Sequence, residues 1–230
     1  MGVLGGMGPE ATLDFMAAVI ALTPAETDQD HIHMIVDNDP TIPARQDAIL
    51  RNGPDPGPAM AVMAKRLQHA GADFLVMPCN TAHAFSGHVT SAVSIPLLSI
   101  IDVTVAASGN FNRVGLMATE GCLHSMVYQS AFAGVGKELL LPGAAQVQEL
   151  MSLTFRIKRG DKGADVAAGM LRLARALQER GAQAIIAGCT EIPLVLQASM
   201  LNIPLISSTD ELAKHTVAYA CGDVAPVNQE

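Results

Sequence analysis

Residues 71–81 read GADFLVMPCNT, and residues 181–190 read GAQAIIAGCT. In each stretch a glycine ends a helical pattern, a short apolar strand follows, and a cysteine stands eight residues after the glycine. Any two strand–helix units share the apolar pattern, but the equal offset of the cysteine has no such general cause. The repeat therefore indicates two equivalent halves rather than one domain.

Two further pairs of segments repeat in the same order along the chain. SIPLLS at residues 94–99 is matched by NIPLIS at 202–207, and MGVLGG at 1–6 is echoed by VGLMAT at 114–119. Several matches in one order are a stronger signal than the shared strand–helix pattern alone. They extend the similarity of the two halves over most of the chain.

Short apolar runs alternate with helical patterns in both halves. The spacing of apolar residues predicts helices at 12–22 and 59–70, and the short runs are typical of strands buried on both faces. We expect an α/β fold of two similar pseudo-symmetric domains, each a mostly parallel sheet flanked by helices, with the active site in the cleft between them. The first domain is expected to comprise residues 1–98 plus 208–222, the C-terminal helix returning to it, and the second residues 99–207.

The composition narrows the class of protein. Of 230 residues, 50% are hydrophobic and 16% charged, so the chain can bury a large core and is not disordered. A net charge of −8 without any block of like charge argues against nucleic acid and against an anionic membrane surface as partners. No apolar run reaches the roughly 18 residues of a spanning helix. The N-terminal residues lack the pattern of a secretion signal, so we expect a cytoplasmic protein. We expect its partner to be a small molecule, and a homodimer is possible.

The two repeated cysteines stand where open parallel sheets bind their ligands. Cys79 and Cys189 each follow a predicted buried strand, so both should face the cleft between the halves. A helix start after each cysteine is expected to favour the thiolate. Two facing thiols favour one reaction, in which a thiolate removes a proton from a carbon and a thiol returns one from the opposite side. Cys122 and Cys221 have no counterpart in the repeat and are expected to be inert.

Three motifs are spread along the chain: GGMG at residues 5–8, MPCNTAH at 77–83 and GCTEIP at 188–193. Together they resemble the aspartate/glutamate racemase family, with the greatest similarity to its aspartate racemase branch. The resemblance implies an amino-acid racemase that uses neither pyridoxal phosphate nor another cofactor. It also implies that Cys79 and Cys189 are the two acid/base residues.

The resemblance further assigns residues that would bind an acidic amino acid. The arginine of the family's Asn-Pro-x-Ile-Pro-x-Arg stretch corresponds to Arg45, and the lysine of its Ile-Lys-x-Gly stretch corresponds to Lys158. A guanidinium can bind a carboxylate bidentately, and an ammonium adds a second positive charge. Arg159 is an alternative to Lys158 in this role. The other residues expected to bind substrate lie in the three motifs and are Met7, Asn80, Thr81, Thr190 and Glu191.

Aspartate is the expected substrate and glutamate the second choice. Thr190 and Glu191 stand where the cell-wall glutamate racemases carry a histidine, which favours aspartate. Two residues depart from the family's pattern and bear on side-chain selectivity: Asp39 is an added acidic residue, and Ala44 replaces one that is commonly acidic.

Other functions stay open at this stage. A decarboxylase or cis–trans isomerase of similar fold would use one cysteine or a covalent step. A dicarboxylate-binding module would be expected to have lost a cysteine or one of the two cations. No nucleotide-binding glycine motif is present, and no metal site is predicted, since His31 and His33 are better explained as an exposed polar pair.

Overall fold

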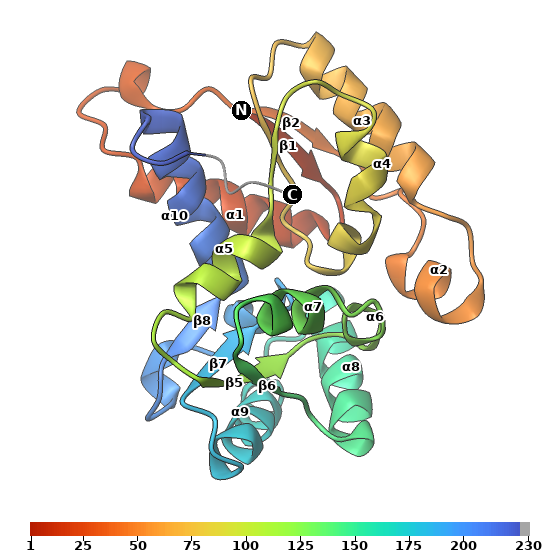
Figure 1. The fold of residues 1–230 in the computed structure, drawn as a ribbon, viewed down its shortest axis with the longest axis vertical. Coiled ribbons are helices and arrows are strands. Elements are labelled where there is room, and N and C mark those ends of the chain that lie inside the picture. Colours follow the sequence, from red (N-terminus) through yellow and green to blue (C-terminus); the bar gives the residue numbers. More distant parts are fainter. Residues whose placement is uncertain (226–230) are drawn as a thin grey trace.

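A computed structural model, which describes residues 1–225, shows two α/β halves stacked one on the other (Figure 1). The first half contains β1 (Gly2–Gly5), α1 (Pro9–Leu22), β2 (Ile35–Asn38), α2 (Arg45–Arg51), α3 (Gly57–His69), β3 (Leu75–Val76), α4 (Ser86–Thr90) and β4 (Leu97–Leu98). After it come α5 (Ile100–Ala107), β5 (Arg113–Met117), α6 (Glu120–His124), α7 (Val127–Gly134), β6 (Glu138–Leu140), α8 (Ala144–Lys158), α9 (Ala164–Glu179), β7 (Ala184–Ala187), β8 (Leu205–Ser207) and α10 (Ser208–Cys221). Short 3-10 turns at Asp28–Asp30, Thr81–Phe85, Ile192–Leu194 and Ala198–Met200 complete the described elements.

Each half is built on a four-stranded parallel sheet, and the two sheets share one strand order. The orders are β2-β1-β3-β4 and β6-β5-β7-β8, and every neighbouring pair is parallel. The strands β3 and β7, which carry the repeated stretch, therefore hold corresponding places in the two sheets. The expected α/β fold with two similar domains is confirmed.

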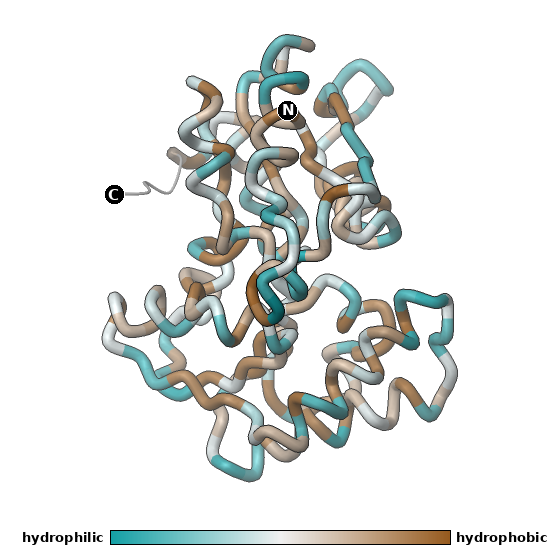
Figure 2. The backbone as a smooth tube through the Cα atoms, turned by 90° about the vertical axis from the view of Figure 1, so that its right-hand side faces the viewer, coloured by the Kyte–Doolittle hydropathy of each residue, from teal (hydrophilic) through white to brown (hydrophobic). Residues whose placement is uncertain are grey.

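The helices cover the sheets through the apolar faces that their sequences predict. Every residue of β1 and of β7 is buried, as expected for strands covered on both sides. The helix predicted at 59–70 is α3, whose buried face carries Met60, Met63 and Leu67 at helical spacing. In Figure 2 the apolar segments run through the interior of both halves, and hydrophilic segments lie mainly along the outer loops.

One apolar cluster joins the two halves. It contains Val3 and Phe15 from the first half together with Val114 and Ile186 from the sheet of the second half. α5 and α10 pack against each other within this layer, and α10 also packs against α1, so the C-terminal helix lies beside the first half (Figure 1). The domain boundaries at residues 98/99 and 207/208 stay a prediction. No helix within residues 1–225 has the length and apolar character needed to span a membrane.

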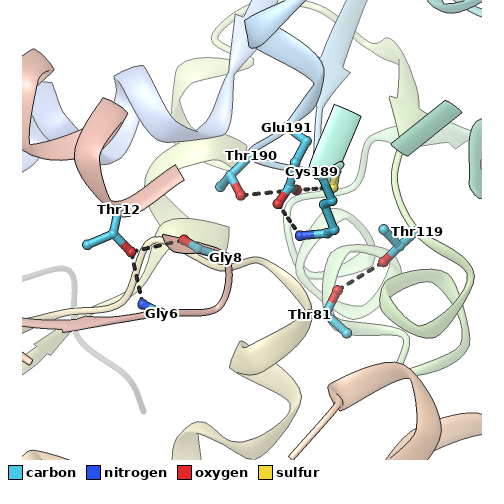
Figure 3. A network of polar contacts seen from close by, with 9 residues as sticks. Gly6, Gly8, Thr12, Thr81, Thr119, Cys189, Thr190 and Glu191 are labelled. Atoms are coloured by element: carbon cyan, nitrogen blue, oxygen red, sulfur yellow. Dashed lines mark hydrogen bonds and ion pairs between the residues drawn. The ribbon is translucent and has the colours of Figure 1, made fainter. Parts of the chain in front are cut away.

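The GGMG motif forms a tight loop between β1 and α1. Gly6 has a φ of +90°, and a Cβ there would lie 2.3 Å from the backbone of Asp39, so only glycine fits. The Thr12 hydroxyl accepts a hydrogen bond from the Gly6 N–H and donates one to the Gly8 carbonyl, both at 3.0 Å (Figure 3). This loop brings Met7 and Gly8 to the boundary between the halves.

Candidate active site

A single cavity collects the carboxyl ends of both sheets. Its volume is about 350 Å³, and residues from both halves line it. Cys79 follows β3 and Cys189 follows β7, so each cysteine reaches the cavity from the corresponding strand of its own sheet. Each cysteine residue is 7% exposed.

Every residue assigned to the site from the sequence lines this cavity. The set comprises Met7, Arg45, Cys79, Asn80, Thr81, Lys158, Cys189, Thr190 and Glu191. Lys158 lines the cavity and Arg159 does not, which favours the lysine of the two alternatives. Among residues 1–225 no group of three or more histidine, cysteine, aspartate or glutamate side chains is arranged to hold a metal ion.

In the second half, the buried carboxylate of Glu191 contacts several of the other polar residues that line the cavity. The Cys189 thiol donates a hydrogen bond to Glu191 Oε2 at 2.9 Å, and the Lys158 ammonium pairs with Glu191 Oε1 (Figure 3). The Thr190 hydroxyl lies 3.4 Å from Glu191 Oε2. A Cβ on Gly8 would stand 3.3 Å from both the Glu191 oxygen and the Lys158 nitrogen, so the GGMG loop lies directly against this ion pair.

These contacts change how readily Cys189 ionises. Burial first, and then the Glu191 carboxylate, raise the pKa of the Cys189 thiol well above its ordinary value, against the opposing charge of Lys158. Burial acts to lower the pKa of Lys158, but Glu191 and Cys189 outweigh it, so that pKa is raised and the ammonium stays charged. The expectation that a helix start favours the thiolate is therefore wrong for Cys189. The segment after it forms only the 3-10 turn Ile192–Leu194, which has no macrodipole of comparable size.

The segment after Cys79 is fixed by buried hydrogen bonds. The Asn80 side-chain amide donates to Ser208 Oγ at 2.9 Å and accepts from the Tyr128 hydroxyl at 2.6 Å, so both ends of the amide are engaged within the protein. Ser208 Oγ in turn donates to the carbonyl of Ala187, at the end of β7, at 2.9 Å. The two strand ends that carry the cysteines are thus tied through one network.

The buried ring of His83 holds the backbone of Cys79 in place. Its Nδ1 lies 2.9 Å from the Cys79 carbonyl oxygen, and its Nε2 accepts the backbone N–H of Ile100 at 3.2 Å. These two contacts require the proton on Nδ1. Burial lowers the pKa of His83 to about 4, which keeps the ring neutral. The side chain does not line the cavity, so His83 positions the cysteine's backbone rather than contacting substrate.

Two polar contacts cross between the halves at the cavity wall. The hydroxyls of Thr81 and Thr119 lie 2.9 Å apart (Figure 3), and Gln46 Oε1 accepts the backbone N–H of Gly121 at 2.7 Å. Thr119 and Gln46 were not predicted from the sequence as site residues. The echo of residues 1–6 at 114–119 was a signal for Thr119, since it places this residue at the end of a strand equivalent to β1.

Arg45 is the first residue of α2 and faces the cavity. Its Nη1 donates to the carbonyl oxygens of Ile42 and Pro43 at 3.0 and 2.8 Å, which fixes one nitrogen of the guanidinium and leaves Nε and Nη2 without a protein partner among residues 1–225. None of the ion pairs among residues 1–225 involves Arg45, whereas its neighbour Arg51 is paired with Asp47 at 2.7 Å. The guanidinium of Arg45 thus remains able to bind an anion.

The cavity wall also has an apolar part that sequence analysis missed. It is formed by Leu50, Met151 and Phe155, from α2 and α8. Phe155 is 49% exposed. The helical patterns of α2 and α8 show no special signal for these positions, because an apolar residue on an amphipathic helix is most often core.

Fold and site together define a two-domain α/β enzyme whose paired cysteines face one interdomain cavity. The chain matches the Asp/Glu/hydantoin racemase family over residues 4–216. It belongs to this family, and it is a racemase. The resemblance drawn from the three sequence motifs is confirmed.

Relatives of known structure and sequence agree with this assignment. The broad specificity amino-acid racemase RacX of Bacillus subtilis is 31% identical over 223 residues, which cover 95% of this chain and 96% of that protein. A glutamate racemase of Corynebacterium glutamicum is 29% identical over 66% of this chain and 57% of its own. The structure of Picrophilus torridus aspartate racemase superposes with a TM-score of 0.86 at 28% identity, covering 96% of this chain and 94% of that one.

Proposed function

We propose that this enzyme interconverts the L and D forms of an acidic amino acid, aspartate foremost, by proton transfer between Cα and two cysteines. The observation that carries the proposal is the placement of Cys79 and Cys189, at equivalent strand ends of two similar sheets, on one cavity of about 350 Å³. Such a cavity has room for a small amino acid between the two sulfur atoms.

The proposed reaction needs one thiolate and one thiol. The thiolate takes the Cα proton, so a C–H bond breaks, an S–H bond forms and the electron pair remains on the substrate, delocalised into its carboxylate. The thiol on the other side gives its proton to Cα, so its S–H bond breaks and a new C–H bond forms. The configuration inverts, and the two cysteines have exchanged protonation states. No step requires pyridoxal phosphate or a metal ion.

Two cations on the cavity wall support an anionic substrate. Arg45 has a free face for a carboxylate, and bidentate binding would orient the amino acid between the sulfur atoms. Lys158 lies close enough to both cysteines to feel their charge, and it supplies a positive centre where the electron pair develops. Because Lys158 already forms an ion pair with Glu191, its ammonium would interact with the substrate carboxylate and the Glu191 carboxylate at the same time.

A second candidate is a racemase of wider specificity. It is favoured by the apolar wall of Leu50, Met151 and Phe155, which suits a neutral side chain better than a carboxylate. The full-length similarity to RacX, which is named for broad specificity, points the same way. Both candidates share the two-cysteine chemistry and differ only in what the far end of the cavity accepts.

The deciding experiment is incubation with single amino acids in D₂O, following loss of optical rotation and entry of deuterium at Cα. The aspartate proposal expects aspartate to lead the panel by a wide margin in kcat/KM, with glutamate second. Comparable rates for neutral amino acids favour the wider specificity. Release of CO₂ or isomerisation of a double bond, in place of deuterium entry, would establish a decarboxylase or cis–trans isomerase. Binding without exchange would establish a dicarboxylate-binding module.

A further inference from the structure

The two cysteines have the same exposure but different polar partners. Cys189 donates its thiol proton to a buried carboxylate oxygen of Glu191 at 2.9 Å. Among the hydrogen bonds of residues 1–225, the sulfur of Cys79 makes none to a carboxylate; only its backbone groups are engaged, by Met77 and His83. The pseudo-symmetry of the sheets is therefore broken at the reacting atoms.

The charge of Glu191 decides the direction of the hydrogen bond. Its other oxygen forms an ion pair with the Lys158 ammonium. An ionised carboxylate can only accept hydrogen bonds, so the proton between it and Cys189 belongs to the sulfur. A thiolate at Cys189 would face a carboxylate oxygen at 2.9 Å with no proton between two negative charges.

We propose that Glu191 is a positioning residue that holds Cys189 as a thiol, so that the resting enzyme carries its thiolate on Cys79. The inference rests on the proposed two-cysteine reaction and states which partner acts first. Cys79 takes the proton from the enantiomer whose Cα–H faces it, and Cys189 protonates the opposite side. After this step Cys189 is a thiolate, and the negative charge of Glu191 repels it. Before the next cycle Cys189 therefore takes up a proton and the Cys79 thiol gives one up, which restores the resting state.

Other charged groups around Cys189 do not cancel this asymmetry. Lys158, from α8, faces both cysteines and so lowers the cost of a thiolate at either position. Tyr128, from α7, stays neutral because burial raises its pKa. The other charged residues that line the cavity are Arg45, Asp47, Arg51 and Glu120, and none of them makes a hydrogen bond to the sulfur of Cys79 or Cys189 among the described residues. Glu191 is thus the group that distinguishes the two sulfur atoms.

Alkylation tests the inference without any substrate. Iodoacetamide reacts with thiolates, and peptide mass spectrometry assigns each adduct. Exposed Cys221 serves as an internal reference in every sample. At neutral pH we expect Cys79 to react at least about tenfold faster than Cys189, since the thiolate fraction changes tenfold per pKa unit. The two cysteine residues are each 7% exposed, and repeating the alkylation at high pH, where both thiols are ionised, separates ionisation from access.

Glu191→Gln supplies the decisive comparison. It removes the negative charge and leaves Lys158 unpaired, so Cys189 should gain about tenfold or more in alkylation rate while Cys79 changes little. The alkaline limb of the kcat/KM profile should move to lower pH. The matched control is Glu10→Gln, which breaks a carboxylate–lysine pair with Lys162 away from the cavity and should alter neither readout. Glu191→Asp retains the charge at a greater distance and should give an intermediate rate.

Exchange of the Cα proton with solvent tests which cysteine removes that proton. Cys79→Ala retains only the Cys189 thiol, so it should not exchange the Cα proton of either enantiomer at neutral pH. The double variant Cys79→Ala/Glu191→Gln should recover exchange for one enantiomer.

Separate outcomes test the inference and the proposed function. Equal alkylation of Cys79 and Cys189 in the wild type overturns the inference, as does a Glu191→Gln enzyme with unchanged Cys189 reactivity. If no amino acid is racemised, the proposed function is wrong. The ratio of the Cys79 and Cys189 alkylation rates still tests whether Glu191 holds Cys189 as a thiol.

Discussion

The sulfur atoms of Cys79 and Cys189 carry the proposed proton transfers. We expect Cys79→Ser and Cys189→Ser each to reduce racemisation of aspartate to background, since a serine hydroxyl is a far weaker acid than a thiol and its anion is not available at neutral pH. Cys221→Ser, at an exposed position outside the cavity, is the control and should keep full activity. The measurement is formation of D-aspartate with time. A wild-type rate in either active-site variant contradicts the mechanism.

The planar fork of Arg45 is the expected anchor for a substrate carboxylate. Arg45→Ala should lower kcat/KM for aspartate by roughly tenfold to a hundredfold, since a charge-assisted hydrogen bond contributes about 1.5–3 kcal/mol. Arg45→Lys should also be impaired, because an ammonium cannot bind a carboxylate bidentately. Arg51→Ala is the comparison: Arg51 lines the same cavity but is already paired with Asp47, so its loss should matter less. An unchanged kcat/KM in both Arg45 variants removes it from the site.

Sequence analysis found the cysteines but not the groups that distinguish them. The equal offset in the two halves singles out Cys79 and Cys189, because a repeated position is visible without any fold. The pairing of Lys158 with Glu191 is not visible in this way. The two residues are separated by the whole of α9 and β7, and only the tertiary fold brings the last residue of α8 to the segment after β7. The sequence therefore predicted both as substrate-binding residues and could not show that they bind each other.

The buried network around Asn80 joins the segment after Cys79 to α7, β7 and α10, and Tyr128 on α7 is its largest member. We expect Tyr128→Phe to lower the free energy of unfolding by about 1–3 kcal/mol, since it leaves the buried Asn80 oxygen without its donor. Urea denaturation followed by circular dichroism measures this loss, because the chain has no tryptophan. Tyr219→Phe is the matched control: the ring of Tyr219 packs edge-on against Phe74, and phenylalanine keeps that contact. Equal losses in the two variants would show that the Asn80 network does not contribute to stability.

Elements with strong apolar patterns were predicted well, and elements set by tertiary contacts were not. The strand after Gly181 and the helix near residues 59–70 lie where the sequence places them, since their buried faces follow a regular period. The helices expected directly after the two cysteines are only short 3-10 turns, at Thr81–Phe85 and Ile192–Leu194. Helix α2 was not predicted, because its seven residues bury no apolar face and it begins at Arg45, whose contacts with loop carbonyls are specific to the fold.

On the scale of the whole molecule, the halves are similar in topology, and each has an apolar cluster of its own beside one cluster that they share. Residues of both sheets belong to one apolar cluster, and Thr81–Thr119 and Gln46–Gly121 bond across the cavity. The repeat in the sequence predicted two domains, yet periodicity within each half carries no information on how tightly they pack together. We expect a single cooperative unfolding transition in calorimetry, since loss of either half exposes the shared cluster. Two separated transitions would show that the halves unfold independently.

The stability of the whole molecule should also depend on pH through His83. In the unfolded chain its pKa is about 6.5, whereas burial lowers its pKa in the fold to about 4. Between these values the unfolded state binds the proton and the folded state does not, so the free energy of unfolding falls as the pH decreases. The slope approaches about 1.4 kcal/mol per pH unit, or roughly 3 kcal/mol over the whole window, and this stability is fully present above pH 6.5.

Urea denaturation at pH 7.5, 6 and 5, in wild type and in His83→Gln, measures this contribution. The variant should be less stable at pH 7.5, because it cannot bond both the Cys79 carbonyl and the Ile100 N–H in the same geometry. Its stability should nevertheless fall less between pH 7.5 and 5, since it has no buried group that must stay unprotonated. The exposed His31→Gln variant controls for histidine content and should keep the wild-type slope. Parallel pH dependences of wild type and His83→Gln would mean that His83 has the same pKa in the folded and the unfolded chain, which would contradict this prediction.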